Sequence, residues 1–204
     1  MESRYLQTCA TRQGCTTITL EDGGHLVYLP DFYTREQADG LFTTLQVETP
    51  WENHGNPRLV NWVGEFAYAY ANIRHPAAPW TDCLAVVREE VERLVFGQSA
   101  RQYQGVLLNL YRDGQDGVGF HADNEASILV DSPIASISLG AEREFVLNYR
   151  GKTQPKPRQV RLTLKHGSCV IMGGTIQRHW LHSIPKTVQP IGPRVNLTFR
   201  QYQF

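Results

Sequence analysis

Hydrophobic residues recur at helical spacing in two stretches of the first half of the chain. The first stretch follows Thr34-Arg-Glu-Gln37, a capping-box pattern that predicts a helix start, and its apolar positions are Ala38, Leu41, Phe42 and Leu45. The second begins after Pro79-Trp80-Thr81 and places on one face Leu84, Val87, Val91, Leu94 and Val95. Each apolar stripe is most simply a helix face that packs on a core.

From about residue 103 the hydrophobic period changes to two. This alternation predicts strands at residues 105–111, 134–139, 144–149, 160–164, 168–172 and 194–200. Several short strands with no helical pattern between them indicate a sandwich or barrel. We therefore expect a single α+β domain, mainly β, over residues 1–204. Helices from about 1–104 would pack outside a β-sandwich formed by about 105–204.

Composition and charge are those of a globular protein with a balanced surface. Of 204 residues, 41% are hydrophobic and 20% are charged, which argues against disorder. The formal net charge is zero, so a protein that coats polyanions is not expected. However, residues 1–100 carry a net charge of −6 and residues 101–204 carry +6. A local footprint for nucleic acid therefore remains open.

The cysteines and the N-terminal residues give information about the cellular compartment of the protein. The four cysteines, which form no CxxC pair, are Cys9, Cys15, Cys83 and Cys169. In a chain of this length we expect reduced thiols rather than a disulfide framework. The first residues are too polar for a secretion signal, and no apolar run approaches the roughly 20 residues of a membrane-spanning helix. These features predict a cytoplasmic protein, or a nuclear one if the source is a eukaryote.

Two predicted strands carry polar groups along one face. In residues 194–200 that face holds Arg194, Asn196, Thr198 and Arg200, while Val195, Leu197 and Phe199 share the other. Asn109 and Tyr111 lie opposite Leu108 and Leu110 in the same way. One reading is that these faces are solvated, as in a half-exposed antiparallel strand. The other is that they line a binding site.

The tripeptide His121-Ala-Asp123 suggests a metal site. On an extended chain, residues i and i+2 point to the same side, so the imidazole and the carboxylate can bind one ion. His182 could complete a set of two histidines and one carboxylate, which is the facial triad of non-haem Fe(II) oxygenases. His179 competes for the third position, although it could equally be a core histidine. His166 is expected in a turn with Gly167.

The metal motif is followed by a strand that bears two arginines. A dicarboxylate keto acid can chelate iron through its 1-carboxylate and 2-oxo group, and its distal carboxylate then needs fixed N–H donors. Arginine supplies such a fork bidentately, whereas lysine does not. The order HxD, histidine, arginine-bearing strand therefore contains the groups needed to bind Fe(II) and a keto acid together.

Several motifs together resemble the AlkB family of Fe(II)/2-oxoglutarate dioxygenases. They are Asn109-Leu-Tyr-Arg-Asp-Gly114, Gly119-Phe-His-Ala-Asp-Asn-Glu125, Pro133-Ile-Ala-Ser-Ile-Ser-Leu-Gly140, His166-Gly-Ser and Pro193-Arg-Val-Asn-Leu-Thr-Phe-Arg200. The resemblance runs from about Pro57 to Arg200. It is strongest to the eukaryotic-type members that repair alkylated DNA. Such an ordered conjunction is far more specific than a lone HxD.

The resemblance implies a double-stranded β-helix (jelly-roll) core with N-terminal helices and a nucleotide-recognition lid. It implies that Fe(II) is bound by His121, Asp123 and His182. It assigns 2-oxoglutarate to Asn109, Tyr111, Arg194, Asn196 and Arg200, with Arg200 on the distal carboxylate and Arg194 on the inner one. O₂ is the third reactant, and the products are succinate and CO₂.

The resemblance further implies oxidative demethylation of 1-methyladenine and 3-methylcytosine in DNA, with release of formaldehyde. The lid is expected within 57–70, and the expected substrate-binding residues are Arg58, Tyr68, Tyr70, Asn124 and Glu125. Asn124 stands where close members often have aspartate. Tyr68 and Tyr70 could instead be ordinary strand aromatics. Arg58 could contact a phosphate or the lesion-side strand, or it could lie free on the surface.

Other functions are compatible with the same jelly-roll core. A dioxygenase of this fold could act on RNA, a protein side chain or a small molecule, and a jelly roll that has lost its metal could be a binding module. In the loop before the expected lid, Trp51 is the only strong candidate for a wedge between bases. We therefore expect a monomer for which single-stranded DNA is at least as good a substrate as duplex DNA.

Overall fold

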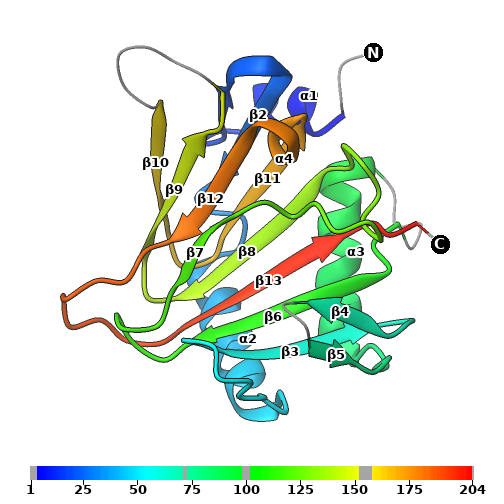
Figure 1. Ribbon diagram of the computed structural model, residues 1–204, viewed down its shortest axis with the longest axis vertical. Helices are drawn as coiled ribbons and strands as arrows, with labels where there is room; N and C mark the ends of the chain where they lie inside the picture. Colours follow the sequence, from blue (N-terminus) through cyan, green and yellow to red (C-terminus); the bar gives the residue numbers. More distant parts are fainter. Residues whose placement is uncertain (1–3, 71–72, 98–101, 152–157, 204) are drawn as a thin grey trace.

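Two antiparallel sheets face each other in the computed structural model, and helices cover the outer side of the larger sheet (Figure 1). The structure describes residues 4–70, 73–97, 102–151 and 158–203. The larger sheet has seven strands in the order β1-β2-β11-β8-β13-β6-β3, and the smaller has four in the order β10-β9-β12-β7. A separate hairpin pairs β4 with β5. This arrangement is the expected jelly roll.

The second half of the chain supplies most strands of both sheets. They are β6 (Gly105–Tyr111), β7 (Val118–His121), β8 (Ile134–Gly140), β9 (Arg143–Tyr149), β10 (Gln159–Leu164), β11 (Ser168–Gly174), β12 (Trp180–Ile184) and β13 (Arg194–Arg200). Six of these eight were predicted to within two residues at each end. The alternation did not indicate β7 and β12, because they are short and carry histidines and glycine among their few apolar positions.

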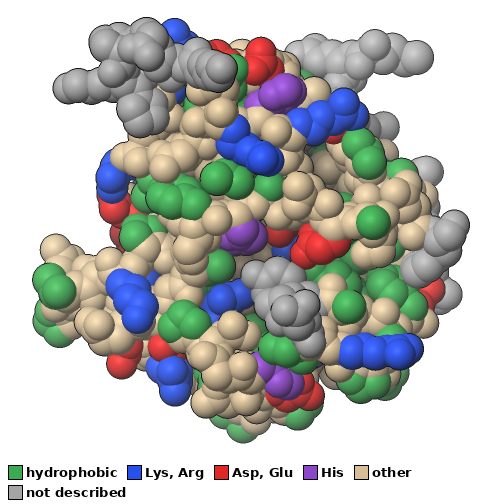
Figure 2. All heavy atoms as spheres, viewed as in Figure 1, with side chains coloured by type: hydrophobic (Ala, Val, Ile, Leu, Met, Phe, Trp, Pro, Cys, Tyr) green, Lys and Arg blue, Asp and Glu red, His purple; other side chains and the backbone are tan. Residues whose placement is uncertain are grey.

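The first half of the chain contributes strands as well as helices. They are β1 (Thr16–Thr19), β2 (Gly24–Leu29), β3 (Leu59–Gly64), β4 (Tyr68–Tyr70) and β5 (Ile73–His75). β2 pairs with β11 and β3 pairs with β6, so the two halves of the chain interleave in one sheet. On the face drawn in Figure 2, acidic, basic and histidine side chains accordingly lie close together around a hollow. The opposite charges of the two halves do not mark separate regions.

The helices are α1 (Arg4–Thr11), α2 (Arg35–Glu48), α3 (Asp82–Phe96) and the short α4 (Ile176–His179), with a 3-10 turn, η1, at Glu21–Gly23. α2 starts at the predicted capping box, in which Thr34 and Gln37 exchange side-chain and backbone hydrogen bonds. The hydroxyl of Thr81 caps α3, which ends at Gly97 in a left-handed conformation with φ of 78°. Both predicted helices are confirmed.

The alternation in β13 separates the core from the site. Val195, Leu197 and Phe199 are fully buried and belong to the core beneath the helices, which includes α3 residues Leu84 and Val91. The opposite face of β13 points between the two sheets. Its polar side chains are buried as well, so the reading of a solvated face is wrong. A closed sandwich covers both faces of a central strand, and the polar face lines an internal cavity.

Two further expectations are tested by the described residues. Cys9 and Cys15 form a disulfide, whereas we expected reduced thiols; the sequence separation of six residues closes a tight loop at the end of α1. Cys83 and Cys169 are free. In the part of the chain that the structure describes, we find no helix with the length and apolarity needed to cross a bilayer.

Candidate iron and 2-oxoglutarate site

Strand pairing brings the HxD motif and the later histidine together. β7 and β12 are neighbours in the smaller sheet, and His121 pairs with His182 across them. The centroids of the two imidazole rings are 4.3 Å apart. Asp123 follows β7, and its Oδ1 lies 3.8 Å from Nε2 of His121. Ligand atoms of the three side chains lie within 4.8 Å of one another, so the predicted triad is assembled.

The donor set fits a divalent iron ion. Oδ2 of Asp123 is buried and has no hydrogen-bond partner among the described residues, an arrangement that a bound cation would satisfy. Nδ1 of His121 lies 2.9 Å from the carbonyl oxygen of Gly119. Because a carbonyl can only accept, Nδ1 carries the proton and Nε2 is left for the metal. Two imidazoles and one carboxylate leave coordination positions open, as Fe(II) oxygenases require.

Electrostatics keep the ligands in the forms that bind metal. Burial opposes the ionisation of Asp123, but the charges of Arg200, His182 and His121 outweigh it and lower the pKa of Asp123. Burial, assisted by His121, lowers the pKa of His182 to about 3. At neutral pH the site therefore presents a carboxylate and a neutral imidazole, and neither has to lose a proton on metal binding.

His179, the competitor for the third position, lies elsewhere. It ends α4, and its Nδ1 is 3.6 Å from Oδ2 of Asp22. Its backbone carbonyl accepts a hydrogen bond from the amide of Arg150. His166 is in the expected turn and contacts Asp39 at 3.0 Å. His182 is thus the histidine that completes the triad.

A cavity between the sheets adjoins the triad, and its wall is the polar face found in the sequence. The wall includes all five residues expected to bind 2-oxoglutarate: Asn109, Tyr111, Arg194, Asn196 and Arg200. All five are buried. β13 pairs with β6 in register, placing Arg194 beside Tyr111 and Asn196 beside Asn109. One register between two strands therefore positions four of the five side chains.

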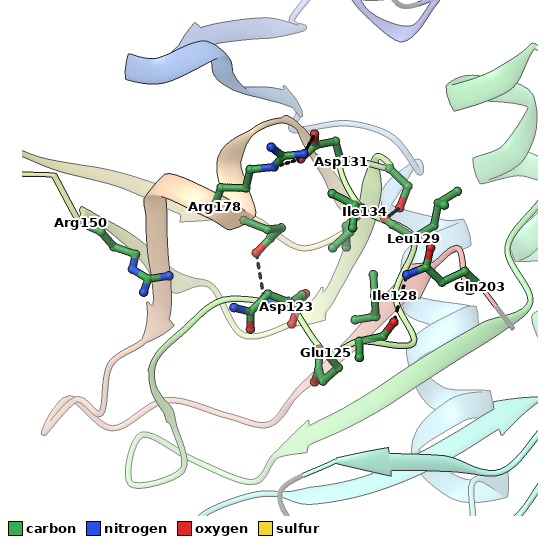
Figure 3. A pocket seen from close by; sticks show the side chains of 14 residues that line it. Asp123, Glu125, Ile128, Leu129, Asp131, Ile134, Arg150, Arg178 and Gln203 are labelled. Carbon is green, nitrogen blue, oxygen red and sulfur yellow. Dashed lines mark hydrogen bonds and ion pairs between the residues drawn. The ribbon is translucent and has the colours of Figure 1, made fainter.

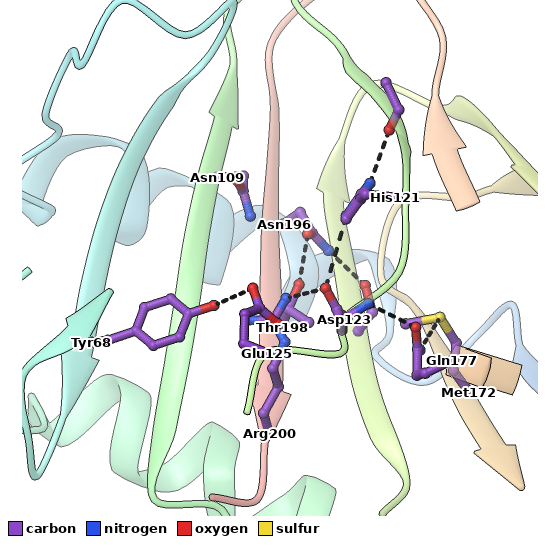
Figure 4. Close-up of polar contacts among 12 residues, drawn as sticks. Tyr68, Asn109, His121, Asp123, Glu125, Met172, Gln177, Asn196, Thr198 and Arg200 are labelled. Atoms are coloured by element: carbon purple, nitrogen blue, oxygen red, sulfur yellow. Dashed lines mark hydrogen bonds and ion pairs between the residues drawn. The ribbon is translucent and has the colours of Figure 1, made fainter. Parts of the chain in front are cut away.

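The two arginines lie at opposite ends of this wall. Arg200 donates from Nη2 to Oδ1 of Asp123 at 2.9 Å (Figure 4). Arg194 donates to the hydroxyl of Ser138 at 2.8 Å and lies over the ring of Tyr111. In both guanidinium groups, Nε and Nη1 are buried without a partner among the described residues. Each arginine therefore has donors free to bind a carboxylate.

This geometry favours the reverse of the expected assignment of the two arginines. Arg200 touches an iron ligand, so it lies where the chelating end of a keto acid must be. Arg194 lies six residues before Arg200 on the same strand, which at about 3.3 Å per residue places its backbone roughly 20 Å away. The long arginine side chains extend into the cavity, so the distance between the two guanidinium groups can be shorter than the distance between the two backbones. Arg194 therefore suits the distal carboxylate and Arg200 the inner one.

Arg58 does not lie on the surface. It is 5% exposed, and its Nε donates to Oδ1 of Asn109 at 2.6 Å. The reason is that it directly precedes β3, which pairs with β6 so that Val60 stands beside Asn109. Residues 59–64 thus form a sheet strand, so within the segment expected to form the lid the β4–β5 hairpin stands apart from the large sheet. Arg58 positions a residue of the 2-oxoglutarate cavity.

Tyr68 and Glu125 meet at the edge of the site. Tyr68 is 1% exposed, and its ring stacks on Trp62 at a centroid distance of 4.5 Å. Its hydroxyl donates to Oε1 of Glu125 at 3.1 Å (Figure 4). Burial raises the pKa of Tyr68 well above its usual value, so this hydroxyl stays a donor. Oε2 of Glu125 is buried with no partner among the described residues.

A pocket of about 280 Å³ opens beside Asp123 (Figure 3). Asn124 and Glu125, two of the expected substrate residues, line it, and Asn124 is exposed. Arg178 pairs with Asp131 on its rim, with Nε 2.8 Å from Oδ1. The backbone of Tyr70 pairs with Ile73 in the lid hairpin, but its side chain falls outside the described part of the chain.

The sequence did not indicate several residues that hold this site. Gln177 accepts a hydrogen bond from the backbone amide of Asp123 at 2.9 Å and thus orients the iron ligand. Ser138 holds Arg194, and Trp62 supports Tyr68. Gln177 lies in a four-residue helix with no periodic signal. Ser138 lies on the polar face of β8, a strand that the sequence predicted. The alternation of polar and apolar residues in that strand could therefore have indicated Ser138.

Comparison with known proteins gives the site its family. The sequence profile of the 2OG-Fe(II) oxygenase superfamily matches residues 25–200. DNA oxidative demethylase ALKBH2 of Bos taurus is 38% identical over 172 residues, which cover 81% of this chain and 60% of that protein. Alpha-ketoglutarate-dependent dioxygenase alkB homolog 3 of Bos taurus is 31% identical over 208 residues, which cover 93% of this chain and 71% of that protein.

A solved structure of OsALKBH1 superimposes with a TM-score of 0.62 over 91% of this chain and 100% of that chain. At 17% identity this likeness supports the fold alone. The superfamily match covers most of the chain, and the relatives agree with the geometry of the triad and cavity. The chain belongs to the 2OG-Fe(II) oxygenase superfamily and, within it, to the AlkB family, and its cofactors are Fe(II), 2-oxoglutarate and O₂.

Proposed function

We propose that this protein removes methyl groups oxidatively from 1-methyladenine and 3-methylcytosine in DNA, releasing formaldehyde. The observation that carries the proposal is the carboxylate of Glu125. One oxygen is held by Tyr68, and the other is buried, unpaired among the described residues and two positions from the iron ligand Asp123. Both methylated bases are cations at neutral pH. A buried, half-satisfied carboxylate beside the metal suits such a base better than a neutral one.

His121, Asp123 and His182 hold Fe(II), and the cavity along β13 holds 2-oxoglutarate. When bound, the iron and the keto acid activate O₂ to oxidise a C–H bond, the keto acid leaving as succinate and CO₂. The protein orients the reactants and keeps water away from them. Arg194 binds the distal carboxylate, Arg200 binds the inner one and holds Asp123, and Arg58 fixes the amide of Asn109.

Base recognition is assigned to the lid hairpin and the loop after β7. Glu125 accepts from the exocyclic amino group of the cationic base, and Tyr68 keeps that carboxylate in place. Tyr70, on the same hairpin, supplies a ring for stacking, an interaction worth about 1–3 kcal/mol per base. Asn124 contacts the base from the exposed side of the pocket. A base whose Watson–Crick edge is methylated pairs poorly, so it costs less to flip into the pocket.

We propose a monomer that uses single-stranded DNA at least as well as duplex DNA. Trp51, the candidate wedge, is partly buried against the core, and its indole nitrogen donates to the carbonyl of Gln46 at 3.2 Å. A side chain held in this way is not free to enter a base stack. RNA of the same sequence is the principal alternative substrate, since a single strand presents the same flipped base.

The test is formaldehyde release from one methylated sequence presented as single-stranded DNA, duplex DNA and RNA, at one fixed salt concentration. We expect turnover of single-stranded DNA at a rate equal to or above that of duplex DNA. Conversion of 2-oxoglutarate to succinate without formaldehyde from any of the three would contradict the proposed substrate. A marked duplex preference that disappears in Trp51→Ala would contradict the proposed strand preference. Light scattering of the same sample checks the oligomeric state.

A further inference from the structure

A second cluster of metal-binding side chains lies outside the iron triad. It consists of Glu52 and His54, from the loop between α2 and β3, and His75, the last residue of β5. Oε2 of Glu52 is 2.6 Å from Nε2 of His54 and 3.5 Å from Nδ1 of His75. One carboxylate oxygen therefore faces nitrogen atoms of two imidazoles. This cluster shares no residue with the iron triad.

Backbone pairing holds the cluster in place. The amide and carbonyl of Glu52 exchange hydrogen bonds with Val60 of β3 at 2.8 and 3.0 Å. His75 pairs with Tyr68 across the lid hairpin, and their rings are stacked. The imidazole of His75 is 3% exposed, against 26% for His54 and 44% for the side chain of Glu52. A rigid buried ligand thus faces two ligands that can adjust.

The spacing of the ligand atoms suits a tetrahedral ion. Zinc bound at about 2.0–2.1 Å by nitrogen and oxygen separates its ligand atoms by roughly 3.3 Å. In the cluster, ligand atoms of the three side chains all lie within 4.8 Å of one another, and the shortest separation is 2.6 Å. Small movements of the two partly exposed side chains bring all three separations to the required value.

The ligand types agree with the geometry. The nitrogen of His75 that faces Glu52 is Nδ1, and this imidazole is buried. Two imidazoles and one carboxylate are the ligand set of His₂Glu zinc sites, in which the fourth position belongs to water.

We propose that Glu52, His54 and His75 form a second divalent-metal site, with Zn²⁺ as its natural occupant. The ion would tie the loop before β3 to the β4–β5 hairpin. This inference does not depend on the proposed function, because it concerns residues that touch neither iron nor 2-oxoglutarate. For the enzyme, the bound ion would anchor the β4–β5 hairpin at the pair formed by Tyr68 and His75.

The experiment counts zinc in variants that lack the iron site. Chelator-treated protein is dialysed against Zn²⁺, and bound metal is measured by mass spectrometry. Wild type should bind two ions, and His121→Ala with Asp123→Ala should bind one. Adding His54→Ala, or separately Glu52→Gln, to that double variant should lower the count to zero. Adding His179→Ala instead should leave it at one, because among the described residues this histidine contacts Asp22 but belongs to no cluster of three ligands.

Two results would overturn the proposal. If the iron-site double variant binds no zinc, the cluster is an ion pair only. If it binds one zinc and His54→Ala and Glu52→Gln leave that count unchanged, the ion sits elsewhere. The absorption of bound Co²⁺ provides a second readout in folded protein. Its visible bands should persist in the iron-site double variant and vanish when Glu52→Gln is added.

Discussion

The cavity proposed for iron and 2-oxoglutarate and the face proposed to receive the base are built differently. The first uses side chains from paired strands: His121 faces His182 across β7 and β12, and Arg194 faces Tyr111 across β13 and β6. The second uses a hairpin of two three-residue strands and the loop that follows β7. A hydrogen bond from Tyr68 to Glu125 joins the hairpin to this loop.

This difference separates the chemistry from the choice of substrate. Strands that are hydrogen-bonded in a sheet cannot shift without breaking those bonds, so the reacting groups keep their distances. A short hairpin and a loop tolerate substitution, because few backbone hydrogen bonds depend on them. Changes in the cavity should therefore abolish all turnover, whereas changes on the recognition face should affect the methylated base alone.

The largest effect is expected at the metal. His182→Ala should reduce the conversion of 2-oxoglutarate to background, since the remaining two ligands cannot hold Fe(II) in an open site. Circular dichroism should show an intact fold. His179→Ala is the matched control and should retain activity. A dead His179→Ala beside an active His182→Ala would mean that the third ligand has been misassigned.

The next effect separates the two arginines. Arg194→Lys keeps the charge but loses the fork, and loss of a buried charged hydrogen bond costs about 2–5 kcal/mol, so the KM for 2-oxoglutarate should rise about 30- to 5,000-fold. Turnover of 2-oxobutyrate, which lacks the distal carboxylate, should change little. Arg200→Lys should impair both keto acids, because it contacts the iron ligand. Equal losses with both keto acids in Arg194→Lys would restore the original assignment.

A smaller effect is expected on the recognition face. Glu125→Gln preserves shape and removes the charge, and a hydrogen bond to a charged group is worth about 1.5–3 kcal/mol. The kcat/KM for 1-methyladenine in DNA should therefore fall about 10- to 150-fold. Conversion of 2-oxoglutarate without substrate should persist. The uncharged base 3-methylthymine serves as the comparison, and an equal loss for both bases would show that charge is not what Glu125 contributes.

The smallest effect is expected for Tyr68→Phe. The ring still stacks on Trp62, and only the hydrogen bond to Glu125 is lost. Such a bond contributes about 0.5–1.5 kcal/mol, which predicts a loss of about 2- to 12-fold in demethylation. Formaldehyde release checks this value, and thermal unfolding checks that the core is intact. A loss as large as that of Glu125→Gln would mean that Tyr68 itself contacts the base.

Local chemistry made much of the fold predictable. The capping box at Thr34, the apolar stripe that includes Val91 and the alternation of residues 194–200 each act over a few residues, so the sequence indicates them directly. The same is true of His121 and Asp123, whose i, i+2 spacing is a property of any extended chain. In these cases the structure confirmed the element and the side on which its polar groups lie.

Other features were decided only when distant segments paired. The sequence allowed either His179 or His182, and the register of β12 against β7 selected His182. Arg58 is directed into the cavity because β3 joins the sheet beside β6, a pairing across about 50 residues that no local pattern encodes. The contact of Arg200 with Asp123, on which the proposed roles of the two arginines depend, spans 77 residues. Residue types and periods determined which chemistry the chain can perform, whereas the antiparallel registers of its sheets decided which side chain performs each part, because a one-residue shift in pairing turns every side chain of a strand to the other face.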